Sequence, residues 1–311
     1  MSRALIVGID DYPSVPLNCC IKDAEAVAQM LARNADDSPN FAIKLQTALR
    51  TKAELRESIA EIFAAKDDIT LFYFSGHGFM DEFGGYIVTP DFTDYDEGIS
   101  MVEILKVVNN SPATDRVVIL DCCNSGVFGA PQITDNATHI NEGVTILTAA
   151  GKDESALEID GHGVFTNLLL AALDGGAADL RGKISPGSIY AYVDLAMGPF
   201  GQRPVFKTNI TRFVSLRSSE PPISQSILRK LTLYFLNPDY EYPLDPSYEF
   251  TAKSAKQDNV RILKNFQQLE RVGLLIPVGE EHIYFAAMHK KSCKLTSLGK
   301  HYWALVKEGK I

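Results

Sequence analysis

The sequence lacks the features of a membrane protein and of a disulfide-stapled secreted protein. No apolar run reaches the roughly 20 residues that a helix needs to cross a bilayer, and the short apolar run near the N-terminus is followed at once by Asp10 and Asp11. The five cysteines include two adjacent pairs, at 19/20 and 122/123, which suits neither a disulfide framework nor the C-x2-C spacing of a zinc site. These absences predict a cytoplasmic protein whose thiols stay reduced.

Internal repeats and low-complexity tracts are also missing, and 311 residues with 46% hydrophobic content suffice for one large core and a smaller one. Through residue 216, strand-like and helix-like segments alternate, which predicts an α/β fold with a mainly parallel sheet flanked by helices. The expected strands span residues 3–9, 43–46, 71–74, 85–89, 117–120, 144–149 and 204–214. The expected helices span residues 23–33, 51–65, 100–109, 163–173 and 185–196, the third opened by a capping box of Ser100 and Glu103.

Two of these strands end in chemically reactive residues. One apolar strand runs into Ser75 and His77, and another runs into Asp121 and Cys123. In an open α/β sheet, groups at the carboxyl ends of the strands line the ligand crevice. A histidine and a cysteine delivered to that edge can form a nucleophile–imidazole pair.

Strand alternation distinguishes the two adjacent cysteines. Asp121 and Cys123 are two residues apart and share a face, whereas Cys122 points to the other face. We therefore expect Cys122 to be a buried packing residue, as most intracellular cysteines are, and Cys123 to be the nucleophile.

The spacing and the motifs resemble those of a known peptidase family. His77 precedes Cys123 by 46 residues, close to the separation of about 50 expected for caspases. The Gln-Ala-Cys-x-Gly signature of animal caspases is absent, and residues 121–126 instead resemble the Asp-x-Cys-x-Ser-Gly motif of metacaspases and their bacterial relatives. Residues 163–166 are similar to the helix opening that follows the fifth strand in this family. Residues 1–216 thus resemble a caspase-fold cysteine peptidase of the C14 type.

The resemblance implies a mechanism for these positions. Cys123 would attack the scissile carbonyl as a thiolate, and His77 would polarise the thiol or protonate the leaving amine. The backbone N–H groups of Gly78 and Cys123 would form the oxyanion hole. No acidic orienter for His77 is evident in the sequence.

The resemblance also implies a substrate preference. Cys20, Asp23, Ser75 and Asp121 match the family positions that line the S1 pocket, and Asp121 stands where animal caspases carry Gln. Two carboxylates attract a guanidinium or ammonium group, so the residue before the cleaved bond is predicted to be Arg or Lys. Taken alone, Asp23 would equally suit the first turn of a helix.

The composition changes after residue 216. Residues 217–223 are polar and Pro-rich and are expected to be a linker. Beyond it, residues 224–311 contain a helix at 224–236, an apolar helical stripe at 259–272, an expected strand at 282–287 and a last helix after residue 300. This order resembles a small winged-helix α+β domain.

The second half carries a different charge from the first. Residues 220–311 have 13 Lys plus Arg against 10 Asp plus Glu, a net charge of +3, which leaves −12 on the remainder. A DNA reader usually has a more densely basic helix, so docking of a regulatory protein or ligand is favoured over nucleic-acid binding. No membrane partner is expected.

No cofactor and no metal are expected to be required. Some metacaspases bind calcium through acids near positions 91–97, but a solvated acidic loop is the favoured interpretation here. Two functions stay open: a regulated cysteine endopeptidase, which the resemblance places in stress or antiphage responses, and a non-catalytic caspase-fold adaptor or DNA-binding regulator. The joint presence of His77, Cys123 and the pocket acids favours the enzyme.

Overall fold

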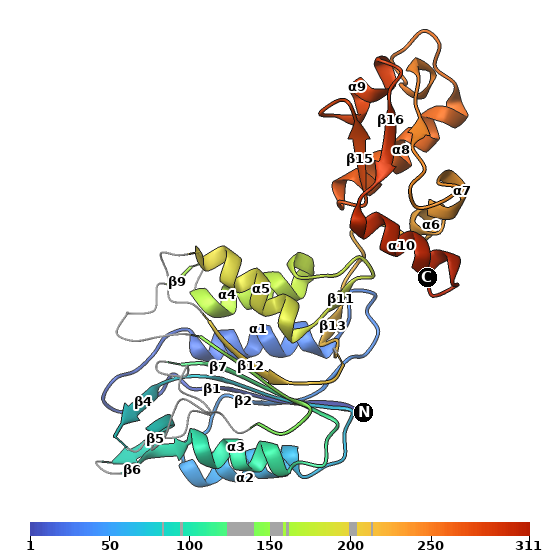
Figure 1. Ribbon diagram of the computed structural model, residues 1–311. Helices are drawn as coiled ribbons and strands as arrows, with labels where there is room; N and C mark the ends of the chain where they lie inside the picture. The colour runs from blue at the N-terminus through green and yellow to red at the C-terminus, as the bar shows by residue number, and fades with distance from the viewer. Residues whose placement is uncertain are drawn as a thin grey trace. The chain divides into compact units, whose positions relative to one another are not determined.

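The computed structural model divides into two compact units, residues 1–178 with 182–220 and residues 179–181 with 221–311 (Figure 1). The structure describes residues 1–82, 84–93, 96–122, 140–149, 158–159, 162–198, 204–212 and 214–311.

The first unit is built on a six-stranded sheet with the order β12-β8-β7-β3-β1-β2. Its neighbouring strands are parallel except at β12, which runs antiparallel to β8. The predicted mainly parallel sheet is therefore confirmed. The strands are β1 (Ser2–Gly8), β2 (Ala42–Gln46), β3 (Ile69–Ser75), β7 (Asp115–Asp121), β8 (Val144–Thr148) and β12 (Val205–Asn209).

Helices cover both faces of this sheet, as the alternating pattern predicted (Figure 1). The helices α1 (Cys20–Ala32), α4 (Val164–Ala171) and α5 (Pro186–Met197) lie on one face, and α2 (Lys52–Phe63) and α3 (Met101–Asn110) lie on the other. A π-helical turn, Ala172–Gly176, continues α4. Successive side chains of β3 point to opposite faces of the sheet and contribute to the hydrophobic core on each side. Tyr73 packs on the α1 side, and Phe72 and Phe74 pack on the α2 side, all three fully buried.

One expected cap is different in the structure. Ser100 caps α3 by accepting from the Val102 amide, but Glu103 does not close a box with it. The Glu103 carboxylate instead accepts both Nε and Nη2 of Arg56 on α2, because a bidentate partner lies within its reach. The capping box is found at α2, between Thr51 and Glu54.

Smaller strands surround the carboxyl edge of the sheet. The antiparallel β4 (Gly78–Asp81), β5 (Gly84–Thr93) and β6 (Asp96–Ser100) form one sheet, which contains the expected hairpin arm, and β9 (Glu158–Ile159) pairs with β10 (His162–Gly163). Two acids of the stretch 91–97 have local partners: Asp91 accepts from the Lys52 amide at the start of α2, and Asp96 pairs with the Lys52 side chain.

The second unit combines helices with a three-stranded sheet of order β14-β16-β15. Its elements are α6 (Gln225–Leu228), α7 (Leu231–Tyr234), β14 (Tyr242–Pro243), a 3-10 turn (Pro246–Tyr248), α8 (Gln257–Arg271), β15 (Leu275–Val278), α9 (Ile283–Met288), β16 (Ser292–Leu295) and α10 (Ser297–Lys307). The apolar stripe of α8 is confirmed, with Leu263, Phe266 and Leu269 buried. The winged-helix assignment stays a prediction.

Two expectations for this unit are wrong. The expected strand at 282–287 is the helix α9, which buries Ile283, Ala286 and Ala287, a spacing that suits a helix rather than a strand. The expected helix at 224–236 is two short helices, α6 and α7.

The expected linker is structured at both of its ends. Arg217–Ser218 forms β13, which pairs with β11 (Lys183–Ile184). Arg217 is buried and donates from Nη1 to the Leu173 carbonyl at 2.7 Å and from Nε to the Arg33 carbonyl at 3.0 Å. Ile223 belongs to the core of the second unit, so the division falls between residues 220 and 221.

Candidate active site

The strand register aligns the two residues that precede the predicted catalytic histidine and cysteine. Ser75 at the end of β3 is the direct partner of Asp121 at the end of β7. His77 and Cys123 each follow two residues beyond this pair in the sequence. Cys123 itself lies outside the described residues.

The imidazole of His77 is held by a backbone carbonyl. Its Nε2 lies 2.7 Å from the carbonyl oxygen of Val15. Because a carbonyl only accepts, Nε2 carries the hydrogen, and in the neutral ring Nδ1 is then the acceptor. Nδ1 is therefore the atom that can take a proton from a thiol.

Tyr12 holds the backbone and the ring of His77 from the same connector, residues 9–19. Its hydroxyl accepts from the His77 amide at 3.1 Å and donates to the Val88 carbonyl at 3.1 Å. The two rings make an edge contact with centroids 4.5 Å apart. Burial raises the pKa of the Tyr12 hydroxyl well above its ordinary value, so the hydroxyl stays protonated and keeps donating.

Gly78 opens β4 directly after His77. Gly78 is the register partner of Ile87 on β5, and the Val88 amide donates to the His77 carbonyl at 2.9 Å, whereas the His77 amide donates to Tyr12. The role of the Gly78 amide as an oxyanion donor stays a prediction.

The four residues expected in the S1 pocket lie at the same edge of the sheet. Cys20, Asp23 and Ser75 are buried, with 7%, 1% and 2% of their surface exposed, and Asp121 is half-buried. Cys20 and Ser75 share a side-chain hydrogen bond, yet burial raises the pKa of the Cys20 thiol far above its ordinary value. Cys20 is therefore a neutral thiol and not a second nucleophile.

Asp23 is held by the two residues of β10. Nδ1 of His162 lies 2.6 Å from Oδ1 of Asp23, and the Gly163 amide donates to Oδ2 at 3.4 Å. Burial raises the pKa of the Asp23 carboxyl, and the hydrogen bonds from His162 and Gly163 oppose that rise.

Asp121 ends a chain of buried hydroxyl groups. Thr166 donates from Oγ1 to Oδ2 of Asp121 at 2.6 Å, so the Tyr73 hydroxyl, 2.6 Å from the same Oγ1, donates to Thr166. Burial raises the pKa of Asp121 to about 6, the Thr166 hydrogen bond opposes that rise and the charge of Asp23 adds to it.

The structure places Cys122 as the alternation predicted. Only 7% of its surface is exposed, and it belongs to the core cluster on the α2 side of the sheet.

Sequence reasoning missed several residues at this edge: Tyr12, Val15, Tyr73, His162 and Thr166. Val15 contributes only a carbonyl, which no side-chain pattern reveals. His162 and Asp23 are 139 residues apart, and only the fold brings them together. The one local sequence signal near these residues was the helix opening at 163–166, which contains Thr166 and directly follows His162.

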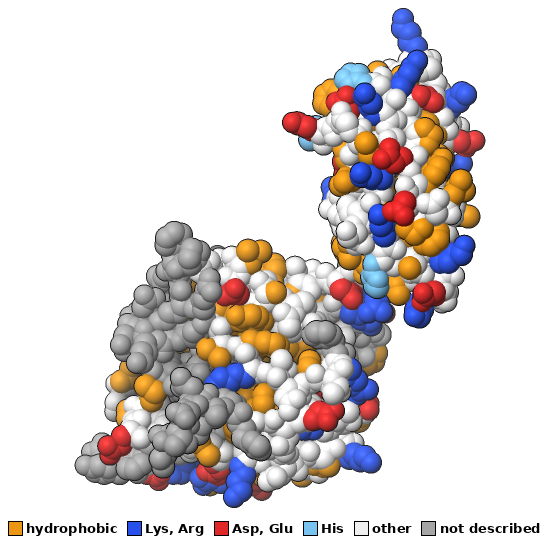
Figure 2. Space-filling model, in the orientation of Figure 1, with side chains coloured by type: hydrophobic (Ala, Val, Ile, Leu, Met, Phe, Trp, Pro, Cys, Tyr) orange, Lys and Arg blue, Asp and Glu red, His pale blue; other side chains and the backbone are white. Residues whose placement is uncertain are grey.

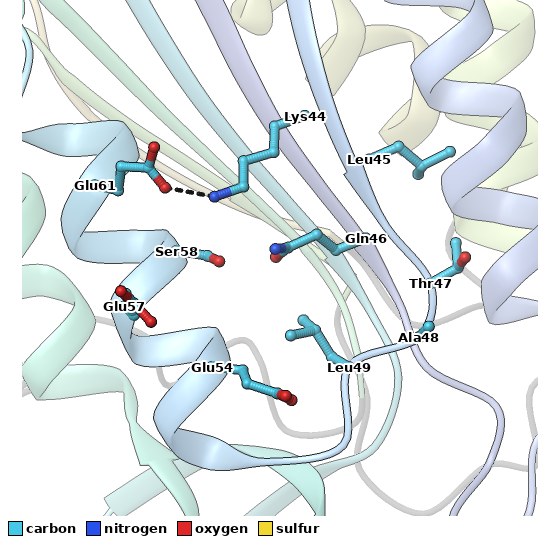
Figure 3. Close-up of a pocket in the computed structure, with 10 residues that line it drawn as sticks. All are labelled: Lys44, Leu45, Gln46, Thr47, Ala48, Leu49, Glu54, Glu57, Ser58 and Glu61. Atoms are coloured by element: carbon cyan, nitrogen blue, oxygen red, sulfur yellow. Dashed lines mark hydrogen bonds and ion pairs between the residues drawn. The ribbon is translucent and has the colours of Figure 1, made fainter.

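A separate cavity of about 590 Å³ lies between β2 and α2 and contains none of these residues (Figure 3). Two of the acids that line it have local partners: Glu61 pairs with Lys44, and Glu54 accepts from the amides of Arg50 and Thr51. We assign no ligand to it. Within the described ranges, no three His, Cys, Asp or Glu side chains are grouped to hold a metal ion. No helix in that part of the chain is both long and apolar enough to cross a bilayer.

Comparison with known proteins decides the family. The family model of the caspase domain, peptidase C14, matches residues 1–215. The chain belongs to the caspase-domain family of cysteine peptidases. The solved structure of caspase-1 from Spodoptera frugiperda is similar to this caspase domain, with a TM-score of 0.50 and 11% sequence identity over 70% of this chain and 90% of that chain. No curated protein matches the sequence. The predicted caspase-like fold is confirmed. The family to which the chain belongs acts on protein substrates.

Proposed function

We propose that this caspase-domain protein is an endopeptidase that cleaves after Arg or Lys, with Cys123 as nucleophile and His77 as its acid–base partner. The observation that carries the proposal is the placement of two neighbouring carboxylates, the buried Asp23 at the start of α1 and the half-buried Asp121 at the end of β7, beside the strand ends that precede His77 and Cys123. A cation stabilises two carboxylates that lie near one another, and a basic substrate side chain supplies one.

The proposed reaction uses Nδ1 of His77. Cys123 passes its thiol proton to this nitrogen and attacks the scissile carbonyl, and the Gly78 and Cys123 amides hold the resulting oxyanion. The imidazolium returns the proton to the leaving amine as the C–N bond breaks, which leaves a thioester. Water then adds to the thioester, Nδ1 takes its proton, and the thiol is restored as the acid product leaves.

A positional-scanning peptide library tests the specificity. We expect the purified protein to cleave after Arg and Lys and to reject Asp, because two carboxylates repel a third. Cys123→Ala is the matched inactive control. Preferential cleavage after Asp would contradict the pocket assignment.

We further propose that the enzyme acts as an uncut chain. Residues 117–151, which include the connection after the cysteine strand, contain no Lys or Arg, so a pocket selective for basic residues finds no bond to cut there. Activation would come from binding or conformational change. Intact-mass measurement of the active enzyme should give the full-length mass. A cut after Asp135, which lies outside the described residues, would overturn both this proposal and the pocket chemistry.

The second unit is proposed to dock a regulatory protein rather than to read DNA. The net charge of residues 220–311 is only +3, and on the face shown in Figure 2 the basic and acidic side chains of the second unit are interspersed. On α8, Arg261 is engaged by Asp258 at 2.6 Å. We propose a stress or antiphage effector role on the family resemblance. Tight, salt-dependent DNA binding by residues 221–311 would favour the regulator alternative.

A further inference from the structure

We propose that Tyr73 and Thr166 are positioning residues of the S1 pocket: their hydroxyl groups form a one-way chain of hydrogen bonds that fixes Asp121 and keeps it charged, so that cleavage after basic residues depends on this chain. This inference rests on the proposed function, and neither residue belongs to the four expected in the pocket.

The hydrogen bonds that reach Asp121 run in one direction. Each hydroxyl group has a single hydrogen to donate. Thr166 donates its hydrogen from Oγ1 to Oδ2 of Asp121 at 2.6 Å. The Tyr73 hydroxyl lies 2.6 Å from the same Oγ1 and can only donate to it, because the Thr166 hydrogen is already engaged.

The chain continues to two residues expected in the pocket. Ser75 lies two residues after Tyr73 on β3 and shares a side-chain hydrogen bond with it, and Cys20 shares one with Ser75. The Tyr73 oxygen accepts from Ser75, because the hydrogen of Tyr73 is engaged with Thr166. The neutral thiol of Cys20 is then the donor to Ser75. Both residues therefore act on Asp121 through the chain.

The chain is closed off from solvent. Tyr73 and Thr166 are 0% exposed, and Ser75 is 2% exposed. Water therefore cannot replace a donor that is removed. Burial raises the pKa of Asp121, and the hydrogen bond from Thr166 opposes that rise. Loss of the Thr166 hydroxyl should raise the pKa of Asp121 further, because the charged form loses a charge-assisted hydrogen bond.

Asp121 also caps the helix that carries Thr166. The N-cap of α4 is Gly163, which has no side chain to accept from the amides of the first turn. Thr166 is the third residue of α4, the position whose amide a capping side chain binds, and this amide donates to Asp121. The carboxylate is thus held by both the backbone and the hydroxyl of one residue, at the positive end of α4.

The titratable groups around Asp121 determine what its pH response reports. Asp23 and Cys20 face it from α1, and Tyr73 faces it from β3. His162 on β10 faces Asp23. The neighbouring strand β8, Val144–Thr148, has no titratable side chain. Because burial keeps Cys20 and Tyr73 neutral, the pH response of the pocket belongs to the two acids and His162.

Three variants test the inference through the pH profile of kcat/KM for an Arg peptide. Thr166→Val keeps nearly the same shape without the hydroxyl and should move the acid limb of the profile up by about one pH unit, about a tenfold loss on that limb. Its activity should return toward that of the parent at pH 9, where Asp121 is ionised in both proteins. Thr166→Ser keeps the donor and should follow the parent profile. Tyr73→Phe should give a smaller shift in the same direction, since Thr166 still donates.

Two controls separate the pocket from the catalytic pair and from the fold. Alkylation of Cys123 by iodoacetamide reports on the thiol and His77 without S1 contact, and its pH profile should be the same in all variants. Thr145→Val removes another buried hydroxyl, which pairs with that of Thr208 at 2.8 Å between β8 and β12. That variant should leave the pH profile for the Arg peptide unchanged.

Each contrary outcome identifies what is wrong. An unmoved acid limb in Thr166→Val, or a shift that Thr166→Ser shares, would overturn the inference. An equal loss at every pH, or an alkylation profile that shifts as well, would show a merely structural role and would also overturn it. If Thr166→Val does not fold, the Tyr73→Phe profile alone decides. A parent protein that does not cleave after basic residues would overturn the proposed function and this inference together.

Discussion

Asp121→Asn should make the caspase domain more stable and at the same time a poorer enzyme. Burial raises the pKa of Asp121 from an ordinary 3.8 to about 6. Since one pKa unit corresponds to about 1.4 kcal/mol, holding this carboxylate charged lowers the free energy of unfolding by at most about 3 kcal/mol. The residue is half-buried, and solvent screening reduces the expected gain on substitution to about 1–2 kcal/mol.

The pH dependence follows from the direction of the shift. Well below pH 3.8 the carboxyl is protonated in both the folded and unfolded states, so the variant and the parent should have similar stability. Between about pH 4 and pH 6 the unfolded state has lost this proton while the folded state keeps it, so the stability difference should grow across that range and level off above pH 7. Asn keeps an oxygen that can accept from Thr166.

Urea unfolding at pH 3 and pH 8 measures the stability difference, and cleavage of Arg peptides measures the loss of activity. Asp115→Asn is a matched control at the other end of the same strand, where the buried carboxylate pairs with Arg212 at 3.1 Å. That variant should not gain stability at pH 8. An Asp121→Asn protein with unchanged stability at pH 8, or with undiminished Arg cleavage, would refute the reasoning.

Three further predictions concern the nucleophile, the histidine and the boundary. Cys123→Ala should abolish hydrolysis and labelling by an electrophilic peptide, whereas Cys122→Ala should keep both and lose about 1–3 kcal/mol of stability in denaturant titration; the reverse labelling pattern would contradict the strand-face argument. Tyr12→Phe removes the hydroxyl between His77 and Val88 and should lower kcat about tenfold with little change in KM, and an unchanged kcat would refute this role. A chain ending at residue 220 should fold and hydrolyse peptides like the parent, whereas one ending at 216 should melt at lower temperature, because it lacks the buried hydrogen bonds of Arg217; equal melting temperatures would contradict the placement of the boundary.

Most of the first unit could be predicted because its signals are local. A buried strand such as 71–74 is apolar throughout, and the alternation of 121–123 is enough to send Cys122 to the core. The strand order and register then bring Ser75 beside Asp121, as expected for parallel strands with reactive carboxyl ends.

The missed features depend on partners distant in sequence. Glu103 pairs with Arg56 on another helix and does not cap its own helix. His162 contacts Asp23, which lies on α1, and the local sequence around His162 gives no sign of this partner. In the second unit, Tyr284 and Phe285 have high strand propensity, but the burial of residues spaced three and four apart makes the segment helical.

The connector of residues 9–19 has a consequence for how substrate selectivity is expressed. Asp10 accepts the amides of Cys20 and Ile21 at the start of α1, which carries Asp23, while Tyr12 and Val15 hold His77. Under the proposed function, the alignment of the catalytic imidazole and the position of a pocket acid depend on this one short segment. Binding energy from a basic substrate side chain would then help to align the imidazole, so that substrates would differ in turnover and not only in affinity.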